Sequence, residues 1–167
     1  KKRLSKRHGA TSVMEYARQG YLPDAMVNFL ALLGWAPGGD RELMSQAELI
    51  DSFTLEGISG GNAVFNVEKL DWMNAQYLSR LPVATLADLV RPELAGAPPT
   101  ALPVAAAREP LDRLLELLRP RLKTLGDVVD LARPLLAETV EYEPAAVEKH
   151  LGTPDIRGHL EALAAAL

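Results

Sequence analysis

The sequence predicts a mostly α-helical protein. Its apolar residues recur at intervals of three and four in several segments, which places their side chains on one face of an α-helix. Helix-start signals precede two of these segments: Ser45 lies three residues before Glu48, and Asn66 directly precedes an amphipathic run. No pair of alternating apolar and polar segments indicates a β-hairpin, although short strands near Leu43 or Phe65 stay open. We therefore expect helices joined by turns.

The first helix is predicted over residues 13–19, between Ser12 and Gly20. Ser12 and Glu15 have the capping-box spacing, in which each side chain accepts a hydrogen bond from the other residue's backbone amide. Glycine then ends the helix, because it adopts the left-handed conformation that is common just beyond a helix C-terminus.

The second helix is predicted over residues 25–33. Pro23 suits its first turn, where a missing backbone amide breaks no hydrogen bond. Four residues with helical spacing should form its buried stripe: Met26, Phe29, Leu30 and Leu33. Trp35 should pack against this stripe, and a third helix should run from Ser45 to about Phe53.

The next predicted helix starts after Asn66 and ends near Arg80. Its apolar and aromatic stripe is expected in the protein core rather than at a ligand site: Val67, Leu70, Trp72, Met73 and Tyr77. Pro82 marks a break. The following helix is predicted over residues 84–90 and should end before Pro92, because proline disfavours a helical conformation in the residue that precedes it.

The second half of the chain begins with a proline-rich stretch, residues 95–103. It has the composition of a linker, although it can equally be a loop within one helical domain. An amphipathic helix that stops before Pro120 should bury four leucines: Leu111, Leu114, Leu115 and Leu118. Thr124 and Asp127 open the next helix, and Thr153 starts the last one.

Composition excludes several classes of protein. Of the 167 residues, 48% are hydrophobic and 24% charged, which is ordinary for a globular protein. The chain has no cysteine and three scattered histidines, which excludes disulfides and argues against a metal site. No apolar run is long enough for a transmembrane helix, and the N-terminus lacks the apolar core of a signal peptide. We therefore expect no membrane partner and a cytoplasmic location.

Basic residues cluster at the start of the chain, at Lys1, Lys2, Arg3, Lys6 and Arg7. The net charge is −4, and because the first seven residues carry +5, the other 160 carry −9. This distribution excludes a uniformly basic nucleic-acid-binding surface but allows a local basic strip. A flexible cationic loop that leads into a capped helix can hold a polyphosphate. The alternative is a solvated or disordered tail.

Segments along the chain, in order, resemble one family. Residues 3–7, RLSKR, resemble the KMSKS signature of class I aminoacyl-tRNA synthetases, and the continuation His8-Gly9-Ala10 is typical of bacterial glutamyl-tRNA synthetases. The resemblance continues through GYLPDAMVNFLALLGW and FTLEGISGGNAVFNVEKLDWMNAQYL and then RPRLKTL at residues 119–125. It covers nearly the whole chain. One departure is Arg3, where the signature commonly has lysine, which keeps the charge but changes its geometry.

The resemblance implies a domain layout. The expected parts are a signature loop, a helical stem-contact domain, a first helical anticodon-binding subdomain and the start of a second: residues 1–9, 10–80, 81–139 and 140–167. The family's nucleotide-binding fold, HIGH motif and glutamate pocket are expected before Lys1, and the second subdomain is expected to continue past Leu167. We therefore expect a fragment that is catalytically inactive alone.

The resemblance also implies roles for individual residues. Lys6 would be the main catalytic cation, and four residues would contact ATP, with Mg²⁺ as the accompanying ion: Arg3, Ser5, Lys6 and Arg7. Lys69 is expected to contact the tRNA backbone, and Arg121 to face the third base of the glutamate anticodon. Residue type alone leaves other interpretations open. Lys69 can be a solvated lysine, and Arg121, together with Arg119, can neutralise a helix C-terminus.

The implied function is tRNA binding within ATP-dependent glutamate–tRNA ligation, through a glutamyl-adenylate. The implied partner is tRNA(Glu), with ATP and glutamate as substrates of the complete enzyme, no DNA and a monomeric state. The alternative is a helical module that keeps this sequence but binds a partner protein. Weak and salt-sensitive tRNA binding would favour the first hypothesis. Whether the parent enzyme rejects tRNA(Gln) stays open.

Overall fold

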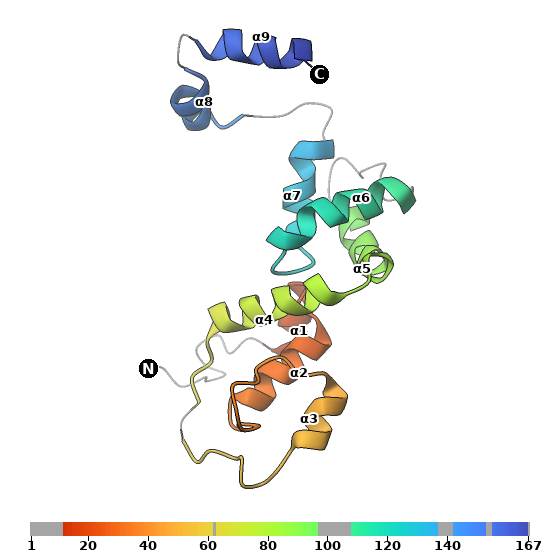
Figure 1. Cartoon of the computed structure of the whole chain (residues 1–167), viewed down its shortest axis with the longest axis vertical. Coiled ribbons are helices and arrows are strands. Elements are labelled where there is room, and N and C mark those ends of the chain that lie inside the picture. The colour runs from red at the N-terminus through yellow and green to blue at the C-terminus, as the bar shows by residue number, and fades with distance from the viewer. Residues whose placement is uncertain (1–11, 62, 97–107, 137–141, 153–154, 167) are drawn as a thin grey trace. The chain divides into compact units, whose positions relative to one another are not determined.

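The computed structural model describes residues 12–61, 63–96, 108–136, 142–152 and 155–166. The chain divides into two compact units, Lys1–Leu136 and Ala137–Leu167. The regular structure of the described ranges is helical, as predicted, and contains no strand (Figure 1). The two segments suggested as short strands are therefore not strands. An isolated antiparallel bridge joins Trp35 to Ile58.

Four helices form the first part of the larger unit (Figure 1): α1 (Val13–Arg18), α2 (Pro23–Leu32), α3 (Gln46–Ser52) and α4 (Val67–Arg80). Helix α2 packs against both α3 and α4. These bounds lie close to the predicted ones. Trp35 is buried beside Ala31 and Leu32 at the end of α2, together with Met44 and Leu49, and not against the predicted stripe of that helix.

Side-chain caps start α3 and α4, as predicted. At α3 the capping box is complete, because Ser45 Oγ accepts a hydrogen bond from Glu48 N at 3.3 Å and the Glu48 carboxylate accepts one from Ser45 N at 2.8 Å. These bonds hold the pKa of Glu48 below its usual value. At α4, Asn66 Oδ1 accepts a hydrogen bond from Lys69 N at 3.2 Å. Both helix starts were therefore readable from residue type and spacing.

The start of α1 differs from its prediction in one respect. Ser12 caps the helix by accepting a hydrogen bond from Met14 N at 3.2 Å. Glu15, predicted to complete a capping box, has its carboxylate 2.7 Å from Arg18 Nη1. Because Arg18 lies one turn further along the same face, this ion pair competes with the reach back to Ser12.

The second part of the larger unit consists of α5 (Val83–Gly96), α6 (Arg108–Leu118), the 3₁₀-helix η3 (Arg119–Arg121) and α7 (Asp127–Leu136). Helices α5, α6 and α7 pack against one another (Figure 1). The four leucines predicted to be buried on α6 are all in this core, together with other apolar residues: Leu86, Ala87, Val90, Leu94, Leu122, Val128 and Ala132. The amphipathic pattern of this segment therefore predicted its buried face correctly.

Helix α5 continues through Pro92, contrary to the prediction that it ends before this residue. A proline inside a helix loses the hydrogen bond to the carbonyl four residues earlier, that of Asp88, at a cost of about 3 kcal/mol. Val90 and Leu94 flank the proline and are fully buried. Burying one such side chain contributes about 1.5–3 kcal/mol, so two of them offset the proline. The first two residues of the predicted linker, 95 and 96, belong to α5, and its other residues lie outside the described ones.

The smaller unit contains α8 (Pro144–Leu151) and α9 (Ile156–Ala166). Helix α9 is the predicted last helix, although Thr153, its predicted start signal, lies outside the described residues. Helix α8 was not predicted, despite having Pro144 in its first turn. No residue of either helix is buried. None of the helices in the described ranges is both long and apolar enough to cross a membrane.

The buried stripe of α2 is shifted from the predicted one. Met26 and Phe29 are buried, but Leu30 is 40% exposed. The polar Asn28 is fully buried instead, with its Oδ1 accepting a hydrogen bond from Met44 N at 2.9 Å. This bond satisfies the buried oxygen, whereas Asn28 Nδ2 has no hydrogen-bond partner among the described residues. Leu33 is partly buried against the same cluster as Met26 and Phe29, so the apolar periodicity was wrong only at Leu30 and missed the polar contact of Asn28.

Asn74 on α4 ties the two parts of the larger unit together. Its side chain is fully buried, with Oδ1 accepting from Leu22 N at 2.8 Å and Nδ2 donating to Lys123 O at 2.5 Å. Close by, Gly20 O accepts a hydrogen bond from Leu125 N at 3.0 Å. Gly20 has φ +85°, and a Cβ there would lie 2.7 Å from Leu125 N. The loop after η3 is therefore fixed against the turn before α2.

We predict that Asn74→Ala lowers the free energy of unfolding by about 2–4 kcal/mol, because it leaves the amide of Leu22 and the carbonyl of Lys123 without their partner. Urea unfolding followed by circular dichroism measures this change. Ser79→Ala is the matched control, since it alters an exposed residue of the same helix and should shift stability by less than about 0.5 kcal/mol. Equal effects of the two substitutions would contradict the role assigned to Asn74.

Candidate nucleic-acid interface

The residues predicted from the signature loop lie outside the described residues. These are Arg3, Ser5, Lys6 and Arg7, so their roles stay predictions. The two other predicted site residues, Lys69 and Arg121, lie on α4 and η3, which are in contact with each other. Among the described residues, no group of histidine, aspartate and glutamate side chains could hold a metal ion.

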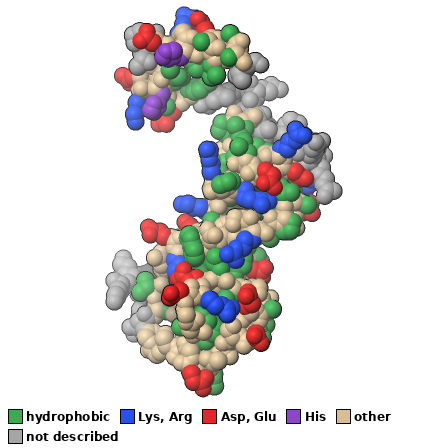
Figure 2. Space-filling model, viewed as in Figure 1, with side chains coloured by type: hydrophobic (Ala, Val, Ile, Leu, Met, Phe, Trp, Pro, Cys, Tyr) green, Lys and Arg blue, Asp and Glu red, His purple; other side chains and the backbone are tan. Residues whose placement is uncertain are grey.

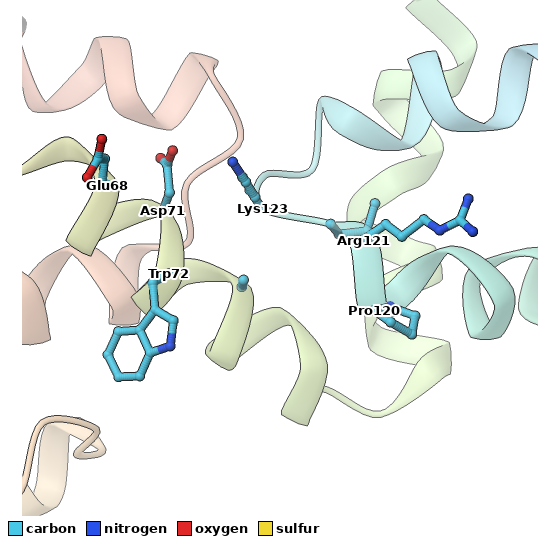
Figure 3. Close-up of a pocket in the computed structure, with 8 residues that line it drawn as sticks. Glu68, Asp71, Trp72, Pro120, Arg121 and Lys123 are labelled. Carbon is cyan, nitrogen blue, oxygen red and sulfur yellow. The ribbon is translucent and has the colours of Figure 1, made fainter.

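An open groove of about 470 Å³ lies between α4 and the segment that begins with η3. Helix α4 lines it with Glu68, Asp71, Trp72 and Ala75. The other wall consists of Pro120, Arg121, Leu122 and Lys123. The groove therefore includes one of the two predicted residues, Arg121, but not Lys69. In Figure 3, Asp71 and Lys123 lie toward one end of the groove and Trp72 and Pro120 toward the other.

The wall formed by residues 120–123 is fixed by hydrogen bonds on both sides. Leu122 is buried, and its amide donates to Arg119 O at 3.2 Å, which closes η3. The amides of Lys123 and Thr124 both donate to Asp127 Oδ2 at 2.8 Å. This carboxylate, on the first residue of α7, holds the loop before the helix, and the predicted opening pair Thr124 and Asp127 is joined by one of these bonds. Together with the bond from Asn74, these contacts hold the backbone of this wall.

The two arginines of η3 have different environments. Arg119 is half-buried, with Nη1 donating to Ser79 O at 3.4 Å and Nη2 lying 3.5 Å from Glu116. It therefore contacts a carbonyl in the last turn of α4, as the helix-terminus interpretation expects for one of the pair. Arg121 is exposed and has no hydrogen bond or ion pair within the described ranges. Its guanidinium extends outward from η3 (Figure 3).

Lys69 is already paired within the protein. Its Nζ lies 2.5 Å from Glu42 Oε1, and both side chains are partly exposed. An exposed ion pair of this kind contributes about 0–1 kcal/mol, so a phosphate can displace the carboxylate at little cost. Lys69 can therefore still be either a solvated lysine or a phosphate contact. In the second case the phosphate would replace Glu42 as its partner.

Trp72 contradicts its prediction as a core residue, because it is 43% exposed. Val67, from the same predicted stripe, is 49% exposed, whereas Leu70 and Met73 are fully buried. Successive residues of a helix are turned by about 100°, so a residue next to Met73 sits at the edge of the buried face. The sequence pattern showed an apolar stripe but did not show where its edge lay. Trp72 is thus a groove residue that sequence analysis missed.

Asp71 is held in place by a hydrogen bond from the hydroxyl of Tyr21. Burial, together with the nearby Asp71 carboxylate, raises the pKa of Tyr21 above its usual value. The phenol therefore stays a donor to Asp71 throughout the physiological pH range. On the face shown in Figure 2, basic and acidic side chains of the larger unit are interspersed, in agreement with the predicted lack of a uniformly basic surface.

Two family models match the chain in succession. Residues 1–72 match the catalytic domain of tRNA synthetases class I (E and Q), and residues 85–167 match the anticodon-binding domain. The chain belongs to the class I tRNA synthetases. The resemblance described from the sequence motifs is therefore confirmed, and the groove joins the end of the first matched region to the second.

Curated relatives and a solved structure agree with this family. Glutamate–tRNA ligase from Desulforudis audaxviator is 41% identical over 155 residues, which cover 92% of this chain and 31% of the relative. The one from Thermodesulfovibrio yellowstonii is 43% identical over 166 residues, covering 98% and 36%. The crystal structure of a glutamate tRNA ligase from Elizabethkingia meningosepticum has the same fold, with a TM-score of 0.79 at 24% identity, covering 98% of this chain and 35% of that one. This synthetase chain thus spans about a third of the length of these relatives.

Proposed function

We propose that this chain is the tRNA-binding part of a glutamate–tRNA ligase. The observation that carries the proposal is the succession of the two family matches, with the end of a synthetase catalytic domain directly before an anticodon-binding domain. The complete enzyme would attach glutamate to tRNA(Glu) using ATP, accompanied by Mg²⁺, through a glutamyl-adenylate. It would act as a monomer in the cytoplasm. The chain alone would be inactive, since the adenylate needs groups that the signature loop does not supply by itself.

We further propose the domain layout expected from the sequence: a stem-contact domain to residue 80, a first anticodon-binding subdomain to residue 139 and part of a second after it. In support, α4 ends at Arg80 and α5 begins at Val83, while the core around α5 also includes Leu22, Ala25 and Leu78 from the proposed stem-contact domain. The division between compact units after Leu136 lies near the second proposed boundary.

The experiment that tests the proposal is a titration of the purified chain with tRNA(Glu) at several salt concentrations. We expect weak binding whose log K falls linearly with log salt, with a slope of about −0.7 to −0.9 per phosphate neutralised. A DNA hairpin of the same length is the control and should bind more weakly. Absence of tRNA binding at low salt would overturn the proposal, and binding of a partner protein alone would favour the interaction-module alternative.

Lys6 is proposed as the main catalytic cation of the complete enzyme, where it would stabilise negative charge that develops on the ATP phosphates. We predict that Lys6→Ala in the full-length enzyme lowers ATP–pyrophosphate exchange by about 10²–10³-fold, the usual effect of removing one preorganised electrostatic contact. Its tRNA affinity should stay nearly unchanged. Arg3, Ser5 and Arg7 would shape the same loop and assist. Undiminished exchange by Lys6→Ala would refute the assignment.

Lys69 is proposed to contact the tRNA backbone, and the pair with Glu42 gives this proposal a sharp test. We predict that Lys69→Ala weakens all tRNAs about equally, since phosphate contacts carry no sequence information. Glu42→Gln is the matched variant, because it frees the lysine and should strengthen binding. If Lys69 is only solvated, neither substitution will change tRNA affinity, and a loss confined to one tRNA would also contradict the proposal.

Arg121 is proposed to face the third anticodon base. Its exposed guanidinium and fixed backbone support this role, because a bidentate contact to a base edge needs a free donor in a defined place. We predict that Arg121→Gln in the full-length enzyme changes the ratio of charging efficiencies for tRNA(Glu) and tRNA(Gln) by the equivalent of about 1–3 kcal/mol, by analogy with base readout in DNA. Arg133→Gln, which alters an exposed arginine of α7, should leave the ratio unchanged. An unmoved ratio in Arg121→Gln would make Arg121 a structural arginine.

A further inference from the structure

The groove between α4 and η3 presents an aromatic surface to solvent. Trp72 is 43% exposed on one wall, whereas the other tryptophan of the chain, Trp35, is 6% exposed. Pro120 adds a second apolar surface on the opposite wall. In Figure 3, the indole of Trp72 projects from α4 away from Asp71 and Lys123, and Pro120 belongs to the other wall of the groove. An indole in this position offers one flat apolar face to a ligand that enters the groove.

The charges of the groove are divided between its walls. Helix α4 contributes the carboxylates of Glu68 and Asp71, and the opposite wall contributes the cation of Lys123, because the guanidinium of Arg121 extends away from α4 (Figure 3). A phosphate would be repelled from the α4 wall and attracted to the opposite one. The α4 wall instead suits a group that is flat and apolar on its face and carries N–H donors on its edge. A nucleotide base has this combination of properties.

Glu68 is well placed to accept from such an edge. It lies one helical turn before Trp72, so the two side chains share a face of α4. It is exposed and has no hydrogen bond or ion pair in the part of the chain that the structure describes. Asp71, held by Tyr21, is a second acceptor at the other end of the groove. An aromatic surface and two carboxylates therefore occur on one wall without a basic residue between them.

We propose that Trp72 stacks on an unpaired base of the bound tRNA, with Glu68 accepting a hydrogen bond from the edge of that base and Lys123 pairing with a neighbouring phosphate. This inference rests on the proposed function, because it takes tRNA as the ligand. It assigns Trp72 as a positioning residue separate from Arg121, whose guanidinium extends outward from η3. Asn74 and Asp127 hold the backbone of Lys123 by hydrogen bonds. These bonds would keep the distance between the two walls of the groove constant.

The test measures tRNA(Glu) affinity of the 167-residue chain as a function of salt. We expect Trp72→Ala to weaken binding by about 5- to 150-fold, the range for loss of one stacked base, with the slope of log K against log salt unchanged. Trp72→Phe keeps an aromatic face and should recover most of the affinity. Lys123→Gln should instead reduce the slope by about 0.7–0.9, the contribution of one phosphate. Leu117→Ala, at a 65% exposed apolar residue of α6, is the matched control without effect.

Tryptophan fluorescence gives a second readout. Binding of tRNA should quench the emission of the unmodified chain more than that of Trp72→Phe, because Trp35 is buried in both. A fully paired RNA duplex should produce no such difference, since it offers no unpaired base. Equal affinities of Trp72→Ala and the unmodified chain, a change in the salt slope of Trp72→Ala, or equal quenching by the duplex would each overturn the stacking role. Failure of the unmodified chain to bind tRNA would instead overturn the proposed function itself.

Discussion

The two hydrogen bonds of the buried Asn74 amide are the constraint on which the candidate interface depends. One bond holds the start of α2 through Leu22 N, and the other holds the loop after η3 through Lys123 O. Because an amide donates and accepts at fixed positions, both segments are placed relative to α4 and not merely packed against it. The positions of Trp72 and Lys123 across the groove follow from this arrangement. An apolar side chain at position 74 could fill the space but could not set these distances.

Gly20 and Asp127 also fix the loop after η3, in addition to the bond from Asn74. Gly20 lies so close to Leu125 that a Cβ at position 20 would not fit. The Asp127 carboxylate accepts hydrogen bonds from the amides of Lys123 and Thr124. Such a rigid support matters for a nucleic-acid contact because the side chains that reach the ligand lose less conformational entropy when their backbone is already fixed. The exposed residues of the groove therefore lie on a backbone that is held by hydrogen bonds from Asn74 and Asp127.

Local signals in the sequence predicted the helices well, and long-range contacts explain most of the errors. The caps at Ser45 and Asn66 and the leucine stripe of α6 involve residues a few positions apart, so spacing alone identifies them. The continuation of α5 through Pro92 depends on burial against α6 and α7, which no local rule includes. Asn74 bonds to residues 52 and 49 positions away. A polar residue in an apolar stripe gives no sign of which distant backbone group it will meet.

The arginines at positions 119 and 121 show the same limit within a single motif. Both are basic, they flank one proline, and residue type assigns them one role. The turn of η3 directs Arg119 toward Ser79 O in the last turn of α4 and toward Glu116 on α6, and leaves Arg121 exposed. The difference arises because a 3₁₀-helix has three residues per turn, so side chains two positions apart point in widely different directions. One arginine thereby serves the packing of the protein, and the other is left free for a ligand.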